Sequence, residues 1–260
     1  MKLNICYTNS CSETARGLAE ELGCKLSKTP VPNLVNIAWG YKQDKPDCLV
    51  WVNNPYAIKK NTNKLMTNYT LEENGIVVAK AFGYEEILEK FDTGQIELPI
   101  IARRGTTQGG SGFVICLSRK HIRTAIEQGY VMFKKYIPIA KEYRIHVFGS
   151  SVLFTSEKIN NDIVLSLNAR NETHFKDIQD IEILNNIAIE SLRATNLLFG
   201  AVDILYGEDD KYYVLEVNTA PSLKEKHLKI YRIAIRSFLG CPEIIEIDDI
   251  LKSLAKMFEA

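Results

Sequence analysis

The sequence lacks an excess of charge of either sign. Lys and Arg together number 32 among the 260 residues, and Asp and Glu also number 32, so the formal net charge is zero. A strongly basic chain would indicate nucleic acid or an anionic membrane as a partner, because a positive field attracts phosphate groups. Nucleic acid is therefore not an expected partner, and any affinity for phosphate must come from a local site.

Long hydrophobic runs are also missing. No stretch of the chain approaches the roughly 18 to 20 uninterrupted apolar residues that a membrane-spanning helix needs. The opening residues Met1-Lys2-Leu3-Asn4 begin a strand pattern rather than a signal peptide. We therefore expect no membrane partner and a cytoplasmic location.

The cysteines lack the spacing of a metal or redox motif. There are six, without a Cys-x-x-Cys pair, and in a chain of this length they do not form a disulfide framework. Reduced and mostly buried thiols are expected. Cys11 is the exception, because it lies in an expected loop where a substrate could touch it.

Hydrophobic residues make up 46% of the chain, which is enough to bury an ordinary core. The length allows one large domain or two to three smaller lobes. A strand pattern at 2–7, a capping box at Ser10-x-x-Glu13 that opens a helix ending before Gly23, and an apolar run at 48–52 predict a small α/β lobe. Residues 24–46, with three prolines, are expected to be mostly loop.

The remaining patterns predict a mixture of helices and antiparallel strands. Helices are expected at 59–74, 84–91, 119–128 and 177–196, with two more after residue 222. Strands are expected at 76–79, 99–102, 113–116, 131–137, 143–149, 151–157 and 163–167.

A β-hairpin is the strongest chemical signal. Two runs rich in β-branched and aromatic residues, 199–206 and 212–218, flank the turn sequence Gly-Glu-Asp-Asp-Lys. Glu216 and Asn218 are two residues apart and project from one face, and a four-residue loop would place Asp203 across from Glu216. Opposed carboxylates repel unless a cation lies between them, and magnesium accepts such oxygen ligands. Ion pairs with neighbouring Lys or Arg would explain the same acids.

A glycine-rich segment follows the strand expected at 99–102. Residues 101–112 read Ile-Ala-Arg-Arg-Gly-Thr-Thr-Gln-Gly-Gly-Ser-Gly, a composition that lets backbone N–H groups approach an anion. The segment has neither the ending of a Walker A loop nor the acidic partner of a dinucleotide fingerprint. A phosphate-binding loop and a flexible turn both remain open. Arg103 could bind phosphate oxygens through two N–H groups at once, whereas spacing alone selects none of the lysines.

These segments together resemble the ATP-grasp superfamily over nearly the whole chain. The hairpin is the most specific element, because it includes the family's 13-residue spacing from Asp203 to Glu216 and the Glu-Val-Asn-x-x-Pro ending. The matching segments are Asn63-Lys64-Leu65, Pro99-Ile-Ile-Ala-Arg103 with the glycine-rich loop, Phe133-Lys-Lys-Tyr-Ile137, Glu142-Tyr-Arg144, Val202-Asp203 and Leu215-Glu-Val-Asn-Thr-Ala-Pro-Ser222.

The resemblance implies an α/β (α+β) ATP-grasp fold in three lobes. A small N-terminal α/β lobe on the substrate side would span residues 1–56, a central lobe with the glycine-rich loop 57–130, and a C-terminal lobe with the metal hairpin 131–260. The nucleotide would bind between the last two. The implied cofactors are ATP and Mg²⁺, with two ions and Mn²⁺ as a substitute.

The resemblance also implies roles for individual residues. Arg103 and Arg144 would be catalytic, with Arg144 steadying charge near the γ-phosphate, although a cross-strand ion pair would also explain Arg144. The metal ligands would be Asp203, Glu216 and Asn218. Nucleotide contacts would come from Lys64, Arg103, Gly109, Gly110, Ser111, Lys134, Tyr136, Ile137 and Glu142, of which Lys64 and Glu142 could instead be surface charges. Substrate contacts would come from Asn168 and Arg170.

Two positions depart from the family pattern. Lys134 occupies the hinge position that usually carries an acid or amide toward the adenine amino group, so adenine would be read through backbone groups. Ala201 replaces an arginine that D-alanine ligases carry two residues before the metal-binding aspartate. The resemblance therefore favours the ribosomal-protein-glutamate or phage-type carboxylate–amine ligases over the D-alanine ligases.

The reaction implied is ATP-dependent joining of a carboxylate to an amine. ATP would phosphorylate the carboxylate, and the amine would attack the acylphosphate to give an amide or peptide bond, ADP and phosphate. The partners would be a small-molecule carboxylate and amine, or a peptide. Two alternatives stay open: a kinase on the same scaffold, and a non-catalytic module that binds a nucleotide or grips nucleic acid through the basic residues 134–144. Neither the substrates' identity nor the oligomeric state can be read from the pattern.

Overall fold

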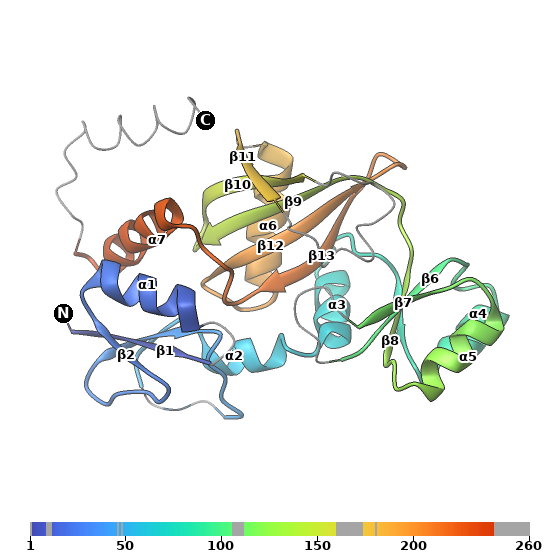
Figure 1. Ribbon diagram of the computed structural model, residues 1–260, viewed down its shortest axis with the longest axis horizontal. Helices are drawn as coiled ribbons and strands as arrows, with labels where there is room; N and C mark the ends of the chain where they lie inside the picture. The colour runs from blue at the N-terminus through green and yellow to red at the C-terminus, as the bar shows by residue number, and fades with distance from the viewer. Residues whose placement is uncertain are drawn as a thin grey trace. The chain divides into compact units, whose positions relative to one another are not determined.

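The computed structural model describes residues 2–8, 12–45, 47, 49–105, 112–159, 174–179 and 181–241 (Figure 1). These residues form two compact units. Unit 1 contains the described residues of Met1–Gly40, Leu49–Val52 and Ala220–Ala260, and unit 2 those of Tyr41–Cys48 and Asn53–Thr219. In this part of the chain every helix is too short or too polar to cross a bilayer.

Unit 1 is a parallel sheet with two helices. Its strands lie in the order β2-β1-β3-β4, and all three pairings are parallel. The strands are β1 (Leu3–Tyr7), β2 (Lys25–Ser27), β3 (Val35–Trp39) and β4 (Trp51–Val52), and the helices are α1 (Ser12–Leu22) and α7 (Glu225–Phe238). The two helices pack together, and Arg232 contacts Glu21 at 3.1 Å.

Most of residues 24–46 lie outside helices and strands, as expected, but the segment also holds two strands that the pattern did not indicate. This segment contributes β2 and β3, which pair with the two sides of β1. Asn36 interrupts the apolar pattern of β3, but it is buried and accepts a hydrogen bond from Asn4 on β1 at 2.8 Å. A buried amide is tolerated in a core when it is hydrogen-bonded. Asn36 therefore breaks the apolar sequence pattern of a core strand without breaking the strand itself.

Unit 2 begins with two helices, where one was expected over 59–74. Helix α2 (Pro55–Lys60) and helix α3 (Lys64–Glu73) are separated by a turn. Asn63 has an extended backbone and its side chain accepts a hydrogen bond from the Met66 N–H, so it caps a new helix. Lys64 therefore stands at the first residue of α3 rather than in mid-helix.

The first sheet of unit 2, here called the four-stranded sheet, has the order β5-β8-β6-β7 with antiparallel pairings. Its strands are β5 (Ala81–Gly83), β6 (Ile100–Arg103), β7 (Phe113–Cys116) and β8 (Met132–Lys135), and its helices are α4 (Ile87–Asp92) and α5 (Arg119–Glu127). Ile100, Ala102 and Phe133 pack with Ile87 and Ile122 in the core of one face. The strand expected at 76–79 is wrong, because only a single bridge from Val78 to Val214 forms there.

The second sheet, here called the five-stranded sheet, has the order β11-β10-β9-β12-β13 and is antiparallel, as expected. Its strands are β9 (Ile139–Phe148), β10 (Ser151–Ile159), β11 (His174–Ile178), β12 (Phe199–Gly207) and β13 (Tyr212–Asn218), and it packs against helix α6 (Glu182–Ala194). The helix expected from Asp177 is wrong at its start, since 174–178 is an edge strand. The strand expected at 163–167 lies outside the described residues, as does any helix beyond residue 241.

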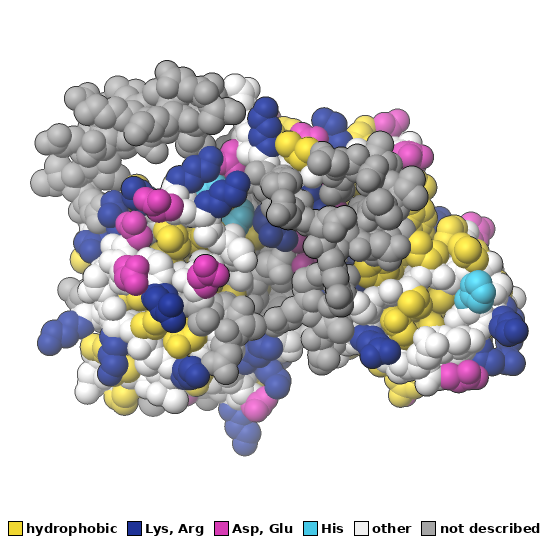
Figure 2. Space-filling model, in the orientation of Figure 1, with side chains coloured by type: hydrophobic (Ala, Val, Ile, Leu, Met, Phe, Trp, Pro, Cys, Tyr) yellow, Lys and Arg dark blue, Asp and Glu magenta, His cyan; other side chains and the backbone are white. Residues whose placement is uncertain are grey.

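The two faces of the five-stranded sheet differ in chemistry. The apolar residues Ile145, Val202 and Ile204 alternate with the charged Arg144 and Asp203, so they project to the opposite side. Helix α6 packs on the apolar side, where Leu192 lies near Gly200. The polar side is where the candidate site lies. On the face shown in Figure 2, basic and acidic surface side chains are interspersed.

Sequence-based lobes and observed units divide the chain differently. Helix α7 belongs to unit 1, whereas the expected boundaries placed it in the C-terminal lobe. The three-lobe division at 56 and 130 stays a prediction.

Candidate active site

A row of polar side chains crosses all five strands of the five-stranded sheet. The strand registers pair Asp177 with Ser156, Ser156 with Arg144, Arg144 with Asp203, and Asp203 with Glu216. Residues that pair across strands project from the same face. The arrangement therefore gathers residues from positions 144 to 216 on one surface, and it confirms that Asp203 lies opposite Glu216.

Asp203 is the centre of this row. Arg144 donates to its two carboxylate oxygens, from Nε to Oδ1 at 2.7 Å and from Nη2 to Oδ2 at 2.8 Å. Asn218 donates from Nδ2 to Oδ2 at 3.0 Å. Burial raises the pKa of Asp203, and the paired guanidinium opposes that shift. Burial alone would lower the pKa of Arg144, but Asp203 raises it, so Arg144 stays charged.

Glu216 is held by a residue far away in the sequence. Lys64 Nζ, at the start of α3, lies 3.0 Å from Glu216 Oε2. Burial alone would raise the pKa of Glu216, but the charges of Lys64 and Arg103 outweigh it and lower the pKa below its ordinary value. The carboxylate is therefore ionised and neutralised by cations from two other elements.

Lys134 adds a third cation to this region. It pairs with Ile101 across β8 and β6, two residues from Arg103, so both long side chains project from the same face of the four-stranded sheet. Only 5% of Lys134 is exposed. Burial, followed by the positive charge of Arg103, lowers the pKa of its amine to about 7. None of the hydrogen bonds and ion pairs formed among the described residues involves its Nζ. The positive charges of Arg103 and Lys64 both disfavour the charged form of Lys134, so an anionic ligand such as a phosphate would suit this group of basic side chains.

The hinge between the two sheets provides apolar surface next to these charges. Ile137 packs with Ala79, Leu205 and Tyr213, and Leu205 is two residues from Asp203 on the same face. The backbone N–H of Tyr136 donates to the Pro99 carbonyl at 3.1 Å. A flat apolar group could lie here, beside the charged row. The nucleotide contacts of Tyr136 and Ile137 stay predictions.

Glu142 is not a free surface carboxylate. Lys158 on β10 contacts it at 2.8 Å, and both side chains are largely buried. A contact between Glu142 and a ribose would have to compete with this ion pair, so that role stays a prediction.

Several predicted residues cannot be placed. Gly109, Gly110 and Ser111 of the glycine-rich loop lie outside the described residues, and so do Asn168, Arg170 and Cys11. The two ends of the loop meet where Arg104 N–H donates to the Gly112 carbonyl at 3.1 Å.

The structure also adds residues to the site that the motifs did not indicate. Ser156 donates to Asp177 Oδ1 at 2.8 Å at one end of the row, and Lys158 and His146 lie on the same face. The signal that could have found them is the period of two along β9 and β10, counted from Arg144 and from its partner Ser156.

The donor set suits a hard divalent cation. Two opposed carboxylates and one amide offer the oxygen ligands that magnesium accepts, and magnesium fills its other positions with water and phosphates. The described part of the chain contains no group of three or more His, Cys, Asp and Glu side chains arranged for a metal. The predicted set has two acids, and the amide of Asn218 stays a predicted third ligand. Lys64 and Arg144 currently neutralise the acids that such an ion would bind.

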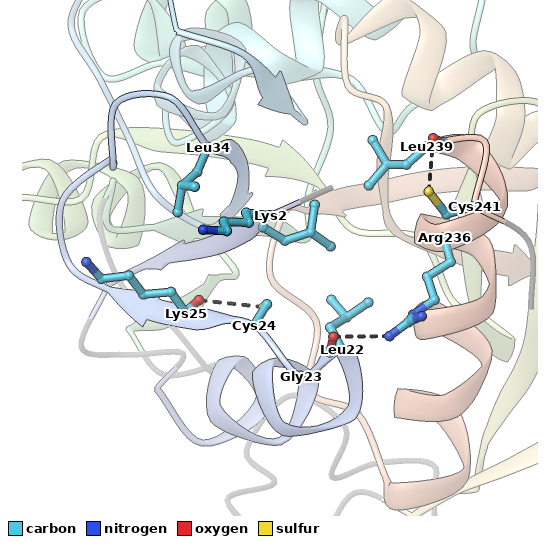
Figure 3. A pocket seen from close by; sticks show the side chains of 10 residues that line it. Lys2, Leu22, Gly23, Cys24, Lys25, Leu34, Arg236, Leu239 and Cys241 are labelled. Carbon is cyan, nitrogen blue, oxygen red and sulfur yellow. Dashed lines mark hydrogen bonds between the residues drawn. The ribbon is translucent and has the colours of Figure 1, made fainter.

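A separate hollow of about 510 Å³ lies in unit 1 (Figure 3). It is lined by leucines, by two thiols, and by the cationic residues Lys2, Lys25 and Arg236, without an acid or an imidazole among its lining residues. Arg236 donates to the Leu22 carbonyl at 3.2 Å, as the dashed line shows. This hollow lacks the chemistry of the charged row.

Comparisons with known proteins agree with the geometry. The model of the RimK-like ATP-grasp domain matches residues 61–237. The chain is 24% identical over 186 residues to the coenzyme gamma-F420-2:alpha-L-glutamate ligase of Methanococcus maripaludis. The aligned region covers 67% of this chain and 64% of that protein. The match thus spans less than two thirds of that relative's length.

Solved structures share the fold at low sequence identity. The ATP-grasp ligase PsnB, complexed with a minimal precursor, has a TM-score of 0.64 at 13% identity and covers 99% of each chain. The D-alanine–D-alanine ligase of Bacillus anthracis has a TM-score of 0.66 at 15% identity, covering 92% of this chain and 98% of its own. The ATP-grasp architecture expected from the sequence is confirmed.

Proposed function

Because this chain belongs to the RimK-like ATP-grasp family, we propose that it is an ATP-dependent carboxylate–amine ligase that releases ADP and phosphate. The observation that carries the proposal is the opposition of Asp203 and Glu216 on one sheet face, with Arg144 and Lys64 bound to them. Carboxylates, arginine and lysine gathered in this way suit a phosphoryl transfer, which needs placement and charge neutralisation more than a covalent side chain.

In the first step a carboxylate oxygen of the substrate attacks the γ-phosphorus of ATP, and ADP leaves. Lys64, Arg103 and Lys134 bind phosphate oxygens through their N–H groups. Lys134 gains an acceptor there, which it lacks among the described residues. Arg144, oriented by Asp203, donates toward the transferred phosphoryl group, where negative charge is spread over the oxygens.

In the second step the amine attacks the carbonyl carbon of the acylphosphate. The C–N bond forms, the bond from the carbonyl carbon to the oxygen bridging to phosphorus breaks, and phosphate leaves. Since an acylphosphate also hydrolyses in water, the glycine-rich segment after Arg103 is proposed as the lid that excludes solvent.

Asp203, Glu216 and Asn218 are the residues that would hold Mg²⁺, with two ions and Mn²⁺ as a substitute proposed. The ion supplies a positive charge that neutralises phosphate oxygens. A solved structure of PsnB contains Mg and ADP, which supports this pairing of cofactors in the shared fold.

The substrates are proposed to be a small carboxylate, or a peptide with a free carboxylate, and an amino acid as the amine. L-Glutamate is the first candidate for the amine, because the relative from Methanococcus maripaludis is named as an alpha-L-glutamate ligase.

The test is a screen of amino acids and short peptides for ADP and phosphate release, followed by mass spectrometry of the product. An amide product, with Asp203→Asn and Glu216→Gln both inactive but folded, is the expected result. A matched control is Asp92→Asn, because Asp92 forms the same two-point contact with Arg119 on an exposed surface. A phosphorylated product without phosphate release would instead identify a kinase. Near-wild-type activity in both hairpin variants would show that Asp203 and Glu216 are not needed as metal ligands.

A further inference from the structure

The hollow in unit 1 lies at one end of the parallel sheet. Lys2 and Leu3 lie where β1 begins, and Lys25 is the first residue of β2. Leu34 directly precedes β3, and the other lining residues belong to the last turns of α1 and α7 or follow them. Open α/β sheets bind their substrates beyond the carboxyl ends of the strands. The hollow is at the amino ends, so a ligand there would occupy a different kind of site.

The hollow has the size and the apolar wall of a small-molecule site. Its volume of about 510 Å³ falls within the range of about 300–1,000 Å³ that is usual for such sites. Burial raises the pKa of Cys24 to about 11, so this thiol is neutral and behaves as an apolar group. The apolar wall consists of leucines and thiols: Leu3, Leu22, Leu34, Leu239, Cys24 and Cys241. A ligand with an apolar body would remove this wall from water.

Three cationic side chains border the apolar wall. Figure 3 shows Lys2 and Lys25 on one side of the hollow and Arg236 on the other. Arg236 is oriented by the hydrogen bond that it donates to the Leu22 carbonyl at 3.2 Å. Its positive charge partly opposes the rise in the pKa of Cys24, so its field acts within the hollow. Among the residues that the structure describes, neither lysine forms an ion pair.

Helix ends account for part of this positive charge but not for all of it. The carboxyl ends of α1 and α7 both border the hollow, and each is equivalent to roughly half a negative charge. Together they offset about one of the three cations. None of the lining residues is acidic. The hollow therefore keeps an excess of about two positive charges, which attracts an anion.

We propose that this hollow binds an amphipathic anion, a carboxylate or phosphate head group carried on an apolar body. The head group lies between Arg236 and the two lysines, and the apolar body covers the leucines. A guanidinium has several N–H donors and can donate to more than one acceptor at once, which suits both kinds of head group. The charged row of the candidate active site belongs to unit 2, so this inference does not depend on the ligase function.

Calorimetric titration of the full-length chain tests the binding. Octanoate and octyl phosphate combine an acidic head with an apolar chain, whereas acetate has only the head and octanol only the chain. The double variant Lys2→Gln with Lys25→Gln removes two exposed cations without touching the apolar wall. Lys28→Gln is the matched control, because Lys28 is an exposed lysine directly after the other end of β2 and does not line the hollow.

A second measurement locates the ligand. Cys241 is exposed and lines the hollow, so a bound ligand should protect its thiol from N-ethylmaleimide. Peptide mass spectrometry follows the reaction. At a ligand concentration of four times Kd, about one fifth of the chains are free, and the reaction of Cys241 should slow about fivefold. Acetate at the same concentration should leave the rate unchanged.

We expect at least one of the two amphipathic anions to bind the wild type about tenfold or more tightly than octanol and acetate. The double lysine variant should bind it about fivefold more weakly, a modest loss because solvent screens exposed charges, and Lys28→Gln should match the wild type. The tighter of the two anions identifies the head group. No binding of either anion, equal binding of octanol, unchanged affinity in the double variant or an unprotected Cys241 would overturn the proposal. ADP formation tests the ligase function separately.

Discussion

Arg144 binds both carboxylate oxygens of Asp203, at 2.7 and 2.8 Å, from the neighbouring strand of the same sheet. This contact joins the two residues that the proposed mechanism needs most, one for the metal and one for the phosphoryl group. It also raises the question of how much the planar guanidinium contributes beyond its charge.

Arg144→Lys should lower kcat/KM for ATP turnover by about 100-fold, because a lysine keeps the charge but donates to only one oxygen at a time. The measurement is steady-state ADP formation, with the melting temperature recorded in parallel. The equivalent change in the exposed pair, Arg119→Lys, should leave both turnover and the melting temperature almost unchanged, because solvent screens an exposed ion pair. Similar kinetics for Arg144→Lys and the wild type would show that two-point binding is not needed.

Lys134→Met should stabilise the nucleotide-free protein by about 1–3 kcal/mol at pH 7, because it removes an amine whose charged form is disfavoured by burial and by Arg103. The gain should depend on pH. Folding lowers the pKa of Lys134 to about 7, against about 10.4 in the unfolded chain, so between these values only the unfolded chain holds the proton.

The unfolded state thus binds more protons in that window, and wild-type stability rises with pH through it. The advantage of the Met variant should therefore be largest at and below pH 7 and shrink toward pH 10. Urea unfolding at pH 6, 8 and 9.5 measures it. The same variant should gain less stability from added ATP than the wild type. If the stability difference between the variant and the wild type did not depend on pH, the assigned burial of the charge would be contradicted.

Gly200→Ala should destabilise the hairpin by about 1–3 kcal/mol, the usual cost of overpacking. A Cβ there would come 2.7 Å from the Asn218 carbonyl oxygen, so β13 would have to shift and Asn218 with it. ATP turnover should fall together with stability in urea. Gly83→Ala is the control, because its Cβ would meet only a leucine side chain at 3.4 Å. Equal effects in the two variants would argue against the close approach of β13.

Chelation of divalent ions should abolish ATP turnover, and added Mg²⁺ or Mn²⁺ should restore it. Thermal unfolding provides a second, independent measurement. Mg²⁺ together with ADP should raise the melting temperature of the wild type but not that of Glu216→Gln. Full turnover in the presence of excess chelator would rule out the assignment of Asp203, Glu216 and Asn218 as metal ligands.

Local patterns predicted the parts of the site that lie within one hairpin. The alternation of side chains was enough to place Glu216 and Asn218 on one face. The expected four-residue loop would pair Tyr206 with Tyr213, whereas Tyr206 pairs with Tyr212, and a register shift between Asp203 and Ile204 restores the predicted pairing of Asp203 with Glu216. Local reading failed where polar residues interrupt an element. Asn36 interrupts the apolar pattern of β3, and Asn63 caps α3 at a position where the helical pattern predicts the interior of one long helix.

The sequence by itself therefore determined the ATP-grasp architecture and the hairpin acids, since motif spacing and a period of two carry that information locally. Only the tertiary structure decided that Lys64 binds Glu216 from 152 positions away, that Arg144 binds Asp203 from 59 positions away, and that His146 lies across from Ala201. The pairings of Arg144 with Asp203 and of His146 with Ala201 depend on the register between strands that are distant in sequence, and the contact of Lys64 with Glu216 depends on where helix α3 packs against β13. Tertiary packing sets both, and no local pattern encodes them.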